Sequence, residues 1–199
     1  MATDSTQPRP ASALALGLAA FALNLFLVSI SLTGVAPPAT FPVFVASGFF
    51  YGFVQILVGL HEYRIGSSFT GIVFGSFGAF WMSTALLVLL QTMGALTFGD
   101  AAGPALGLYF VAWTIFTVYL WVGSFTVNRV AWAIFTILLV ALVLFDLAQF
   151  GLVPIAYGAW VGLLDAVLAW YLSAALVLNE LFGRTILPLG SPLIRAGAG

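Results

Sequence analysis

Residues 130–150 read VAWAIFTILLVALVLFDLAQF, and Asp146 is their only charged residue. A helix needs about 20 mostly apolar residues to cross the hydrocarbon core of a bilayer, so this stretch is long enough to span it. Other stretches of the chain have the same character, and the full set is residues 13–33, 43–60, 69–93, 104–127, 130–150 and 155–178. The sequence therefore predicts an all-α, polytopic membrane protein of six transmembrane helices.

The composition excludes an ordinary water-soluble domain. Hydrophobic residues make up 63% of the chain and charged residues 6%, whereas about 25% of a soluble domain is charged. Short breaks separate the apolar stretches, so consecutive helices are expected to run antiparallel within one transmembrane domain, residues 13–178. An N-terminal tail (1–12) and a C-terminal tail (179–199) flank it. The first stretch exceeds the apolar region of a signal peptide and is interpreted as helix one.

The arginines orient the predicted helices. The chain has no lysine, and its arginines fall only in the two tails and in the second and fourth connections: Arg9, Arg64, Arg129, Arg184 and Arg195. Positively charged residues are enriched on the cytoplasmic side of membrane proteins. Both termini are therefore predicted to be cytoplasmic, in a multi-pass protein of the cell membrane.

Several classes of function lack the residues that they need. The chain has no cysteine and a single histidine, which argues against a metal site, and no cofactor is expected. His61 stands beside Glu62, but no nucleophile is paired with a base, so no enzyme is expected. Those two residues and Arg64 are interpreted as anchors at the membrane interface. A net charge of -1 offers no basic surface for nucleic acid.

Polar side chains inside the apolar stretches are candidates for function, because hydrocarbon cannot satisfy them. Serines such as Ser76 can bond to the backbone of their own helix. Asn24 and Gln55 carry amides, which suit either a bond between helices or a carboxyl group in transit.

Two carboxyl groups also fall within the spans. Asp146 is expected near the outer interface, where it can be hydrated. Asp165 lies near the middle of the last span with no lysine or arginine at that depth, so it must be protonated, hydrogen-bonded to another helix or in contact with water. A structural role and a role in proton coupling both fit, since acids at the midplane often belong to proton relays.

Glycine pairs at a spacing of four residues occur in several spans. Such pairs let helix backbones approach closely in lipid, and helix packing is their simplest interpretation. The alternative is that some of them narrow a helix where a solute passes. The pairs are Gly48 and Gly52, Gly71 and Gly75, Gly103 and Gly107, and Gly158 and Gly162.

Motifs along the whole chain resemble those of the acetate uptake transporter family, which includes bacterial succinate-acetate permeases and fungal acetate permeases. They are Phe50-Tyr51-Gly52, Glu62-Tyr63 followed by Gly66 and Phe69, Ser76-Phe77-Gly78 with Phe80-Trp81, and the closing Val177-Leu178-Asn179-Glu180, Phe182-Gly183-Arg184-Thr185 and Leu187-Pro188. The resemblance implies transport of acetate or a similar small monocarboxylate, or of succinate. It also implies a hexamer with one pore in each protomer.

The resemblance further implies which residues line that pore. A hydrophobic pore constriction falls on Phe21, Phe77 and Leu138, where bulky apolar groups gate by dewetting. Without the resemblance, Phe21 and Phe77 would be interpreted as packing residues. The substrate pathway is implied to include Leu16, Gly17, Leu18, Asn24, Tyr51, Gln55 and Ser76.

The sequence departs from the family pattern in places. Residues 12–18 read SALALGL where the family signature is Asn-Pro-Ala-Pro-Leu-Gly-Leu, so an asparagine and two prolines are missing. Helix two is one residue shorter between Tyr51 and Gln55, which corresponds to about 100° of helical rotation. Phe77 stands where the family usually has tyrosine.

The spans contain no lysine or arginine that could hold an anion, so a neutral acid is favoured. Proton-coupled uptake is therefore expected, with a small carboxylate, protons, the lipid bilayer and identical subunits as partners. The alternatives are a passive acetate or anion channel and a membrane sensor that responds to acetate without moving it.

Overall fold

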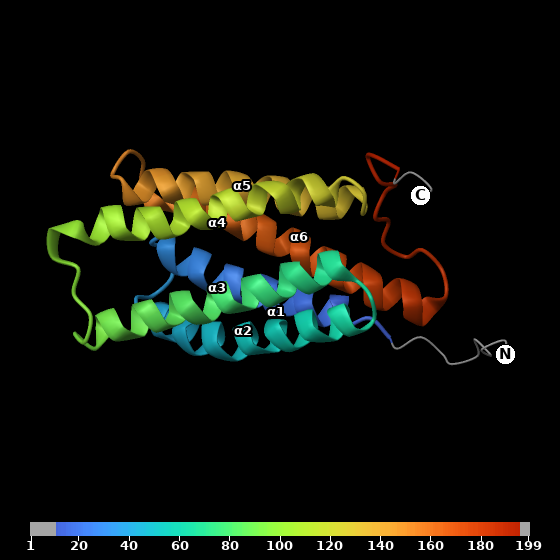
Figure 1. Ribbon diagram of the computed structural model, residues 1–199, viewed down its shortest axis with the longest axis horizontal. Helices are drawn as coiled ribbons and strands as arrows, with labels where there is room; N and C mark the ends of the chain where they lie inside the picture. Colours follow the sequence, from blue (N-terminus) through green and yellow to red (C-terminus); the bar gives the residue numbers. More distant parts are fainter. Residues whose placement is uncertain (1–10, 196–199) are drawn as a thin grey trace.

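Residues 11–195 are described by the computed structural model, and they form one bundle of long helices (Figure 1). The helices are α1 (Leu14–Leu32), α2 (Thr40–Arg64), α3 (Ser68–Thr92), α4 (Ala102–Ser124), α5 (Arg129–Gln149) and α6 (Ile155–Phe182), with a short 3₁₀ turn, η1 (Gly99–Ala101), before α4. Each of these 6 long helices is long and apolar enough to cross a membrane, and the described residues contain no strand. The prediction of an all-α protein with six transmembrane helices is confirmed.

Several helices extend beyond the predicted stretches. α2 begins at Thr40 rather than at residue 43 and continues to Arg64 rather than stopping at residue 60, and α6 continues to Phe182, past residue 178. Polar residues at these ends remain helical because the last turns of a spanning helix reach the polar interface. α4 instead ends at Ser124, before residue 127, and the Asn128 side chain then caps α5 by accepting a hydrogen bond from Ala131 N at 2.8 Å.

The two ends of the bundle differ. At one end, called here the terminal end, α1 begins and α6 ends, while the α1–α2, α3–α4 and α5–α6 connections lie at the far end (Figure 1). The described arginines, Arg64, Arg129, Arg184 and Arg195, all belong to segments at the terminal end. Arg9 lies outside the described residues. This grouping is what the predicted orientation requires, and the cytoplasmic location of both termini stays a prediction.

The helices pack as a ring with one seam. α2 packs against α3 and α1, α1 against α6, α6 against α5, and α5 against α4, whereas the backbones of α3 and α4 come close at few points. Aromatic side chains fill the space between α3 and α4: the ring centroids of Phe80 and Trp113 lie 4.9 Å apart, and those of Phe77 and Trp113 lie 5.9 Å apart. The bundle is therefore closed there by side chains rather than by backbone contact.

Glycine brings α2 and α3 together. A Cβ atom added to Gly52 would lie 2.8 Å from the carbonyl oxygen of Gly78, which is too close for any side chain. The predicted glycine pairs follow the same principle, because an added Cβ would meet another part of the chain at less than 3.0 Å at every member except Gly75. Close helix packing is thus the role that the structure gives these glycines.

Asn179 fixes the segment that follows α6. Its Oδ1 accepts hydrogen bonds from the backbone nitrogens of Ile186 and Leu187 at 2.6 and 3.0 Å, and its Nδ2 donates to the Leu187 carbonyl at 2.9 Å. The chain then reaches the α4–α5 connection, where the Ile194 nitrogen donates to the carbonyl of Phe125 at 3.0 Å. The closing motif therefore ties the C-terminal segment across the terminal end of the bundle.

Substituting Gly52 with valine should destabilise the bundle by about 1–3 kcal/mol, since the new side chain overlaps the Gly78 carbonyl and forces α2 and α3 apart. Thermal unfolding of the purified protein in detergent measures the change. Gly75→Val is the matched control, because a Cβ added there meets nothing within 4 Å. Equal unfolding temperatures for Gly52→Val and the unmodified protein would refute the packing role.

Candidate functional site

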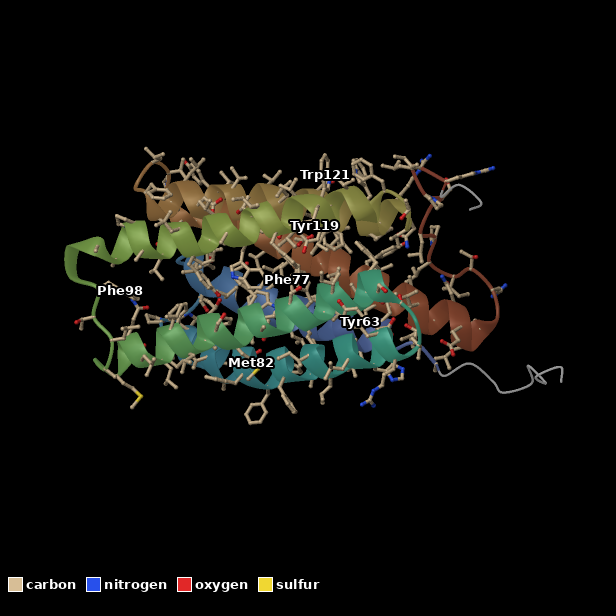
Figure 2. All side chains as sticks on the ribbon, in the orientation of Figure 1. Tyr63, Phe77, Met82, Phe98, Tyr119 and Trp121 are labelled. Carbon is tan, nitrogen blue, oxygen red and sulfur yellow. The ribbon has the colours of Figure 1, made fainter. Side chains whose placement is uncertain are left out.

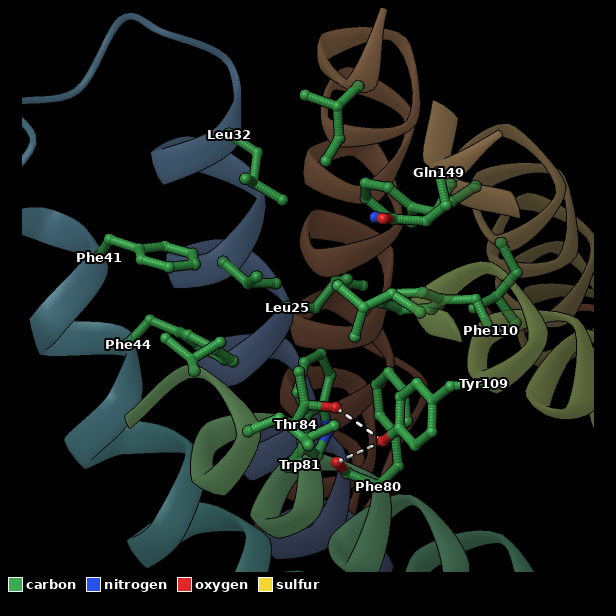
Figure 3. A pocket seen from close by; sticks show the side chains of 18 of the residues that line it. Leu25, Leu32, Phe41, Phe44, Phe80, Trp81, Thr84, Tyr109, Phe110 and Gln149 are labelled. Carbon is green, nitrogen blue, oxygen red and sulfur yellow. Dashed lines mark hydrogen bonds between the residues drawn. The ribbon is translucent and has the colours of Figure 1, made fainter. Parts of the chain in front are cut away.

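A large cavity occupies the half of the bundle nearest the far end. Its volume is about 480 Å³, and its wall includes Leu32 and Gln149 near the far end and Phe80 and Trp81 deeper in the bundle (Figure 3). None of the described residues that line it is charged. The cavity therefore offers a solute hydrogen-bonding and apolar groups but no ion pair.

The three residues predicted for the constriction lie together at the inner end of this cavity. Phe21 from α1, Phe77 from α3 and Leu138 from α5 are all buried and all line it. The rings of Phe21 and Phe77 meet edge to face with centroids 5.6 Å apart. Figure 2 shows Phe77 about midway along the bundle. These three side chains are called the neck below.

A second, smaller cavity lies on the other side of the neck. Its volume is about 70 Å³, and it is lined by Leu18, Phe74 and Ile134, each about one turn nearer the terminal end than a neck residue on the same helix. Its polar lining residues, Thr70 and Asn128, come from the terminal end itself. The two cavities thus lie in line along the bundle, with the neck between them.

This arrangement can be compared with known proteins. Residues 2–188 match the GPR1/FUN34/yaaH family. The chain belongs to the GPR1/FUN34/yaaH family. The family predicted from the motifs is confirmed, because its members include bacterial and fungal proteins named for acetate.

Individual members of the GPR1/FUN34/yaaH family can be aligned with most of this chain. The succinate-acetate/proton symporter SatP of Escherichia coli K12 is 33% identical over 193 residues, covering 94% of this chain and 97% of the relative. Acetate permease A of Emericella nidulans is 31% identical, covering 87% of this chain and 64% of the relative. The solved structure of the bacterial acetate channel SatP is similar with a TM-score of 0.82 and 32% identity, covering 91% of this chain and 99% of that one.

Of the predicted pathway residues in segment 12–18, some lie inside the bundle and one lies on its outer surface. Gly17 lies against α3, where an added Cβ would be 2.7 Å from the Phe74 ring, and Leu18 lines the smaller cavity. Leu16 is 56% exposed and points away from the bundle interior. Tyr51, another candidate for the pathway, is 38% exposed and lines neither cavity. The structure thus places Leu16 and Tyr51 on the outer surface of the protomer.

The predicted amide and hydroxyl candidates lie inside the bundle. Asn24 is fully buried, and its Oδ1 accepts a hydrogen bond from Ser47 on α2 at 2.6 Å. Gln55 is fully buried too, and no described protein group bonds to its amide. Ser76 donates to the carbonyl of Ile72 in its own helix. Neither cavity is lined by Asn24, Gln55 or Ser76.

The two buried acids differ in their surroundings. Asp146 is nearly buried rather than hydrated, and its Oδ2 accepts a hydrogen bond from Thr114 at 2.8 Å. Asp165 is fully buried, and neither of its oxygens has a partner among the described residues. α6 packs antiparallel to α5, with Gly158 against Phe145, so Asp165 lies at about the level of Leu138 and therefore of the neck.

Glu62 has a larger structural role than the sequence indicated. Glu62 is a buried residue of α2. Its Oε1 accepts hydrogen bonds from Ala13 N at 2.7 Å and from the Ser12 hydroxyl at 2.9 Å. Thr70 on α3 donates to its Oε2 at 2.8 Å. A carboxylate at the N-terminus of α1 pairs with free backbone N–H groups. Glu62 thus joins the first turn of α1 to α2 and α3 beside the smaller cavity.

The sequence offered Thr84 as a polar candidate within a span, but its grouping with Trp81 and Tyr109 was not predicted, because only the spatial arrangement brings the three together. Trp81, Thr84 and Tyr109 line the large cavity from α3 and α4. The spacing of Trp81 and Thr84, one helical turn apart, was the available signal, but Tyr109 lies in another span and the sequence does not show that it meets them.

Glu62→Gln should lower the free energy of unfolding by about 1–3 kcal/mol, because the amide NH₂ group faces donors where the carboxylate accepted them. Thermal unfolding in detergent tests this. Glu180→Gln, the same change at an exposed position in the last turn of α6, is the matched control. The interpretation fails if the two variants unfold at the same temperature.

Proposed function

We propose that the protein transports acetate and similar small monocarboxylates, with succinate as a further candidate, across the cell membrane. The observation that supports this best is the pair of cavities in line, separated by the neck of Phe21, Phe77 and Leu138. A path of this kind runs through a single protomer, so each subunit of the proposed homohexamer has its own pore. The relatives named as acetate permease, succinate-acetate/proton symporter and acetate channel support the choice of solute.

The transported species is proposed to be the neutral acid, so that a proton moves with each molecule. No charged residue among those described lines the large cavity, and an anion there would lose its hydration without gaining a counter-ion. A protonated carboxylic acid has a much smaller desolvation cost. The apolar neck favours the same species, because a constriction that sheds water admits a solute that can leave water cheaply.

Asp165 is proposed to take part in proton coupling. It is an ionisable group at the depth of the neck, fully buried and without a protein partner for either oxygen. Buried acids in this position in membrane proteins commonly exchange protons. Phe21 and Leu138 approach from the helices on either side of α6, so a change in the protonation of Asp165 occurs beside the narrowest part of the path.

Uptake of labelled acetate into proteoliposomes tests the proposal. Uptake should occur with the purified protein, exceed that of protein-free liposomes and rise when an inward proton gradient is imposed. Uptake that follows concentration and voltage but not the gradient would favour a passive channel instead. No uptake under either condition would end the transport proposal. In the same assay, Asp165→Asn should lower the stimulation by the gradient to that expected from the change in neutral-acid concentration alone, and unchanged stimulation would remove Asp165 from the mechanism while leaving transport intact.

Leu138→Ala should raise acetate uptake or admit larger acids such as butyrate, since it shortens one side of the neck. Initial rates for a series of labelled acids of increasing chain length provide the measurement. Leu164→Ala is the matched control, because Leu164 lies on α6 but is 53% exposed on the outer surface. Unchanged rates and selectivity in Leu138→Ala would show that the neck does not limit passage.

A further inference from the structure

Two polar groups of α3 face the large cavity just beyond the neck. Trp81 and Thr84 lie one helical turn apart, and both line the cavity (Figure 3). Thr84 follows Phe77 by seven residues, so it lies about two turns, or roughly 10 Å, further toward the far end on the same face of α3. A solute that approaches the neck through this cavity therefore passes Thr84 and Trp81 first.

The Thr84 hydroxyl is the end of a hydrogen-bonded chain. Tyr109 Oη lies 2.9 Å from Thr84 Oγ1 and 2.8 Å from Ser83 Oγ, and Ser83 Oγ lies 3.0 Å from the Phe80 carbonyl oxygen. The Phe80 carbonyl oxygen can only accept hydrogen bonds. Tyr109 Oη lies 3.4 Å from this oxygen, further away than Ser83 Oγ. Tyr109 has a single hydroxyl proton, and when it donates that proton to Ser83 or to the Phe80 carbonyl, the Thr84 hydroxyl is the group that donates to Tyr109.

This direction leaves Thr84 Oγ1 as an acceptor. Its proton is directed to Tyr109, so its lone pairs are what it offers to the cavity. The stacking of Tyr109 on Phe80, with ring centroids 6.0 Å apart and an interplanar angle of 12°, holds the phenol in place. The chain is therefore preorganised to receive a hydrogen-bond donor.

Trp81 supplies the complementary group. Its side chain is only 3% exposed, and its Nε1 has no hydrogen-bond partner among the described residues. A buried indole N–H that lacks an acceptor is costly, so an acceptor brought by a ligand gains most of the value of a full hydrogen bond. Thr84 and Trp81, which carry this acceptor and this donor, thus lie one turn apart on the same wall.

We propose that Thr84 and Trp81 form a binding site for the protonated carboxyl group of a short-chain acid. The acid O–H donates to Thr84 Oγ1, and its carbonyl accepts from Trp81 Nε1, while the alkyl group lies toward the apolar neck. A carboxylate cannot bind in this way, because it has no proton to donate. This inference rests on the proposed function and names the place where the neutral form of the substrate is selected.

Among the described residues, no charged side chain lines the cavity and could disturb this selection. The acids on the neighbouring helices are Asp146, which accepts from Thr114, and Asp165, and neither lines the cavity. Glu62 lies at the opposite end of α2, beside the first turn of α1. Among the described residues, no arginine lines the cavity and could hold a carboxylate there.

The pH dependence of acetate uptake by the unmodified protein in proteoliposomes is the first test. Between about pH 5 and pH 7 the neutral fraction of a small carboxylic acid falls about a hundredfold. The half-saturating concentration of total acetate should rise by a similar factor, and it should stay constant when expressed as neutral acid. A half-saturating concentration of total acetate that does not change with pH would show that the anion binds and would overturn the site.

Variants test the two groups separately. Thr84→Val removes one hydrogen bond and keeps the shape of the side chain, and Trp81→Phe removes the indole N–H together with one ring, so each should raise the half-saturating concentration roughly three- to tenfold. Thr84→Ser keeps the acceptor and should stay within about twofold of the unmodified protein. Thr126→Val, the same chemical change at an exposed position at the terminal end, is the matched control. Unchanged half-saturation in both Thr84→Val and Trp81→Phe would overturn the proposal.

A competition experiment uses the unmodified protein, so its result does not depend on whether the variants fold. Acetamide is neutral and has both an N–H donor and a carbonyl, so it should inhibit uptake of labelled acetate at both pH values. Methyl acetate has a carbonyl but no donor and should inhibit several-fold less. Equal inhibition by the two would refute the acceptor role of Thr84. Absence of any uptake by the unmodified protein would instead refute the proposed function, so the two failures are distinguishable.

Discussion

The structure depends on one constraint, which is that a polar group inside a lipid-spanning bundle must find its partner within the protein. Hydroxyl groups meet this constraint locally: Ser31 donates to the carbonyl of Leu27, and Ser76 to that of Ile72. Glu62 meets it across three helices. Some buried groups have no protein partner, including the Gln55 amide and the Asp165 carboxyl group, and the indole N–H of Trp81 is informative among them because Trp81 lines the large cavity.

Helix packing makes the bundle tight on one side and hollow on the other. α2 and α3 approach so closely that Gly52 and Gly78 leave no room for a side chain, which makes this wall a fixed unit. α3 and α4 meet mainly through aromatic rings, whose size holds the backbones apart. Large side chains at such a seam leave space between them, and the large cavity extends beside Phe80 and Tyr109 for this reason.

The sequence predicted the fold well and the site only in part, for physical reasons. Length and hydropathy predict spanning helices directly, because the bilayer imposes its thickness on every one of them. The neck residues could be named only through the family resemblance, since Phe21 and Phe77 are chemically ordinary core residues. Leu16 and Tyr51 were placed in the pathway by the same route, yet they face outward, because membership of a motif does not fix the direction of a side chain. Glu62 was interpreted as an interfacial anchor, since nothing in a linear sequence shows that Ala13 returns to it.

Phe77 stands where the family resemblance implies a tyrosine, and the cavity beside it gives this difference a physical meaning. A tyrosine at the neck could hydrogen-bond to the solute in the narrowest part of the path. Phe77 cannot, so the last group that can bond to a carboxyl group before the neck is about one helical turn away, on Trp81, and the next is about two turns away, on Thr84. A solute must then cross that distance without a hydrogen-bonding partner from α3. A charged solute would lose its full hydration energy over this step and a neutral acid only a small part of it, so under the proposed function the loss of one hydroxyl at the neck should make the path more selective for the protonated form.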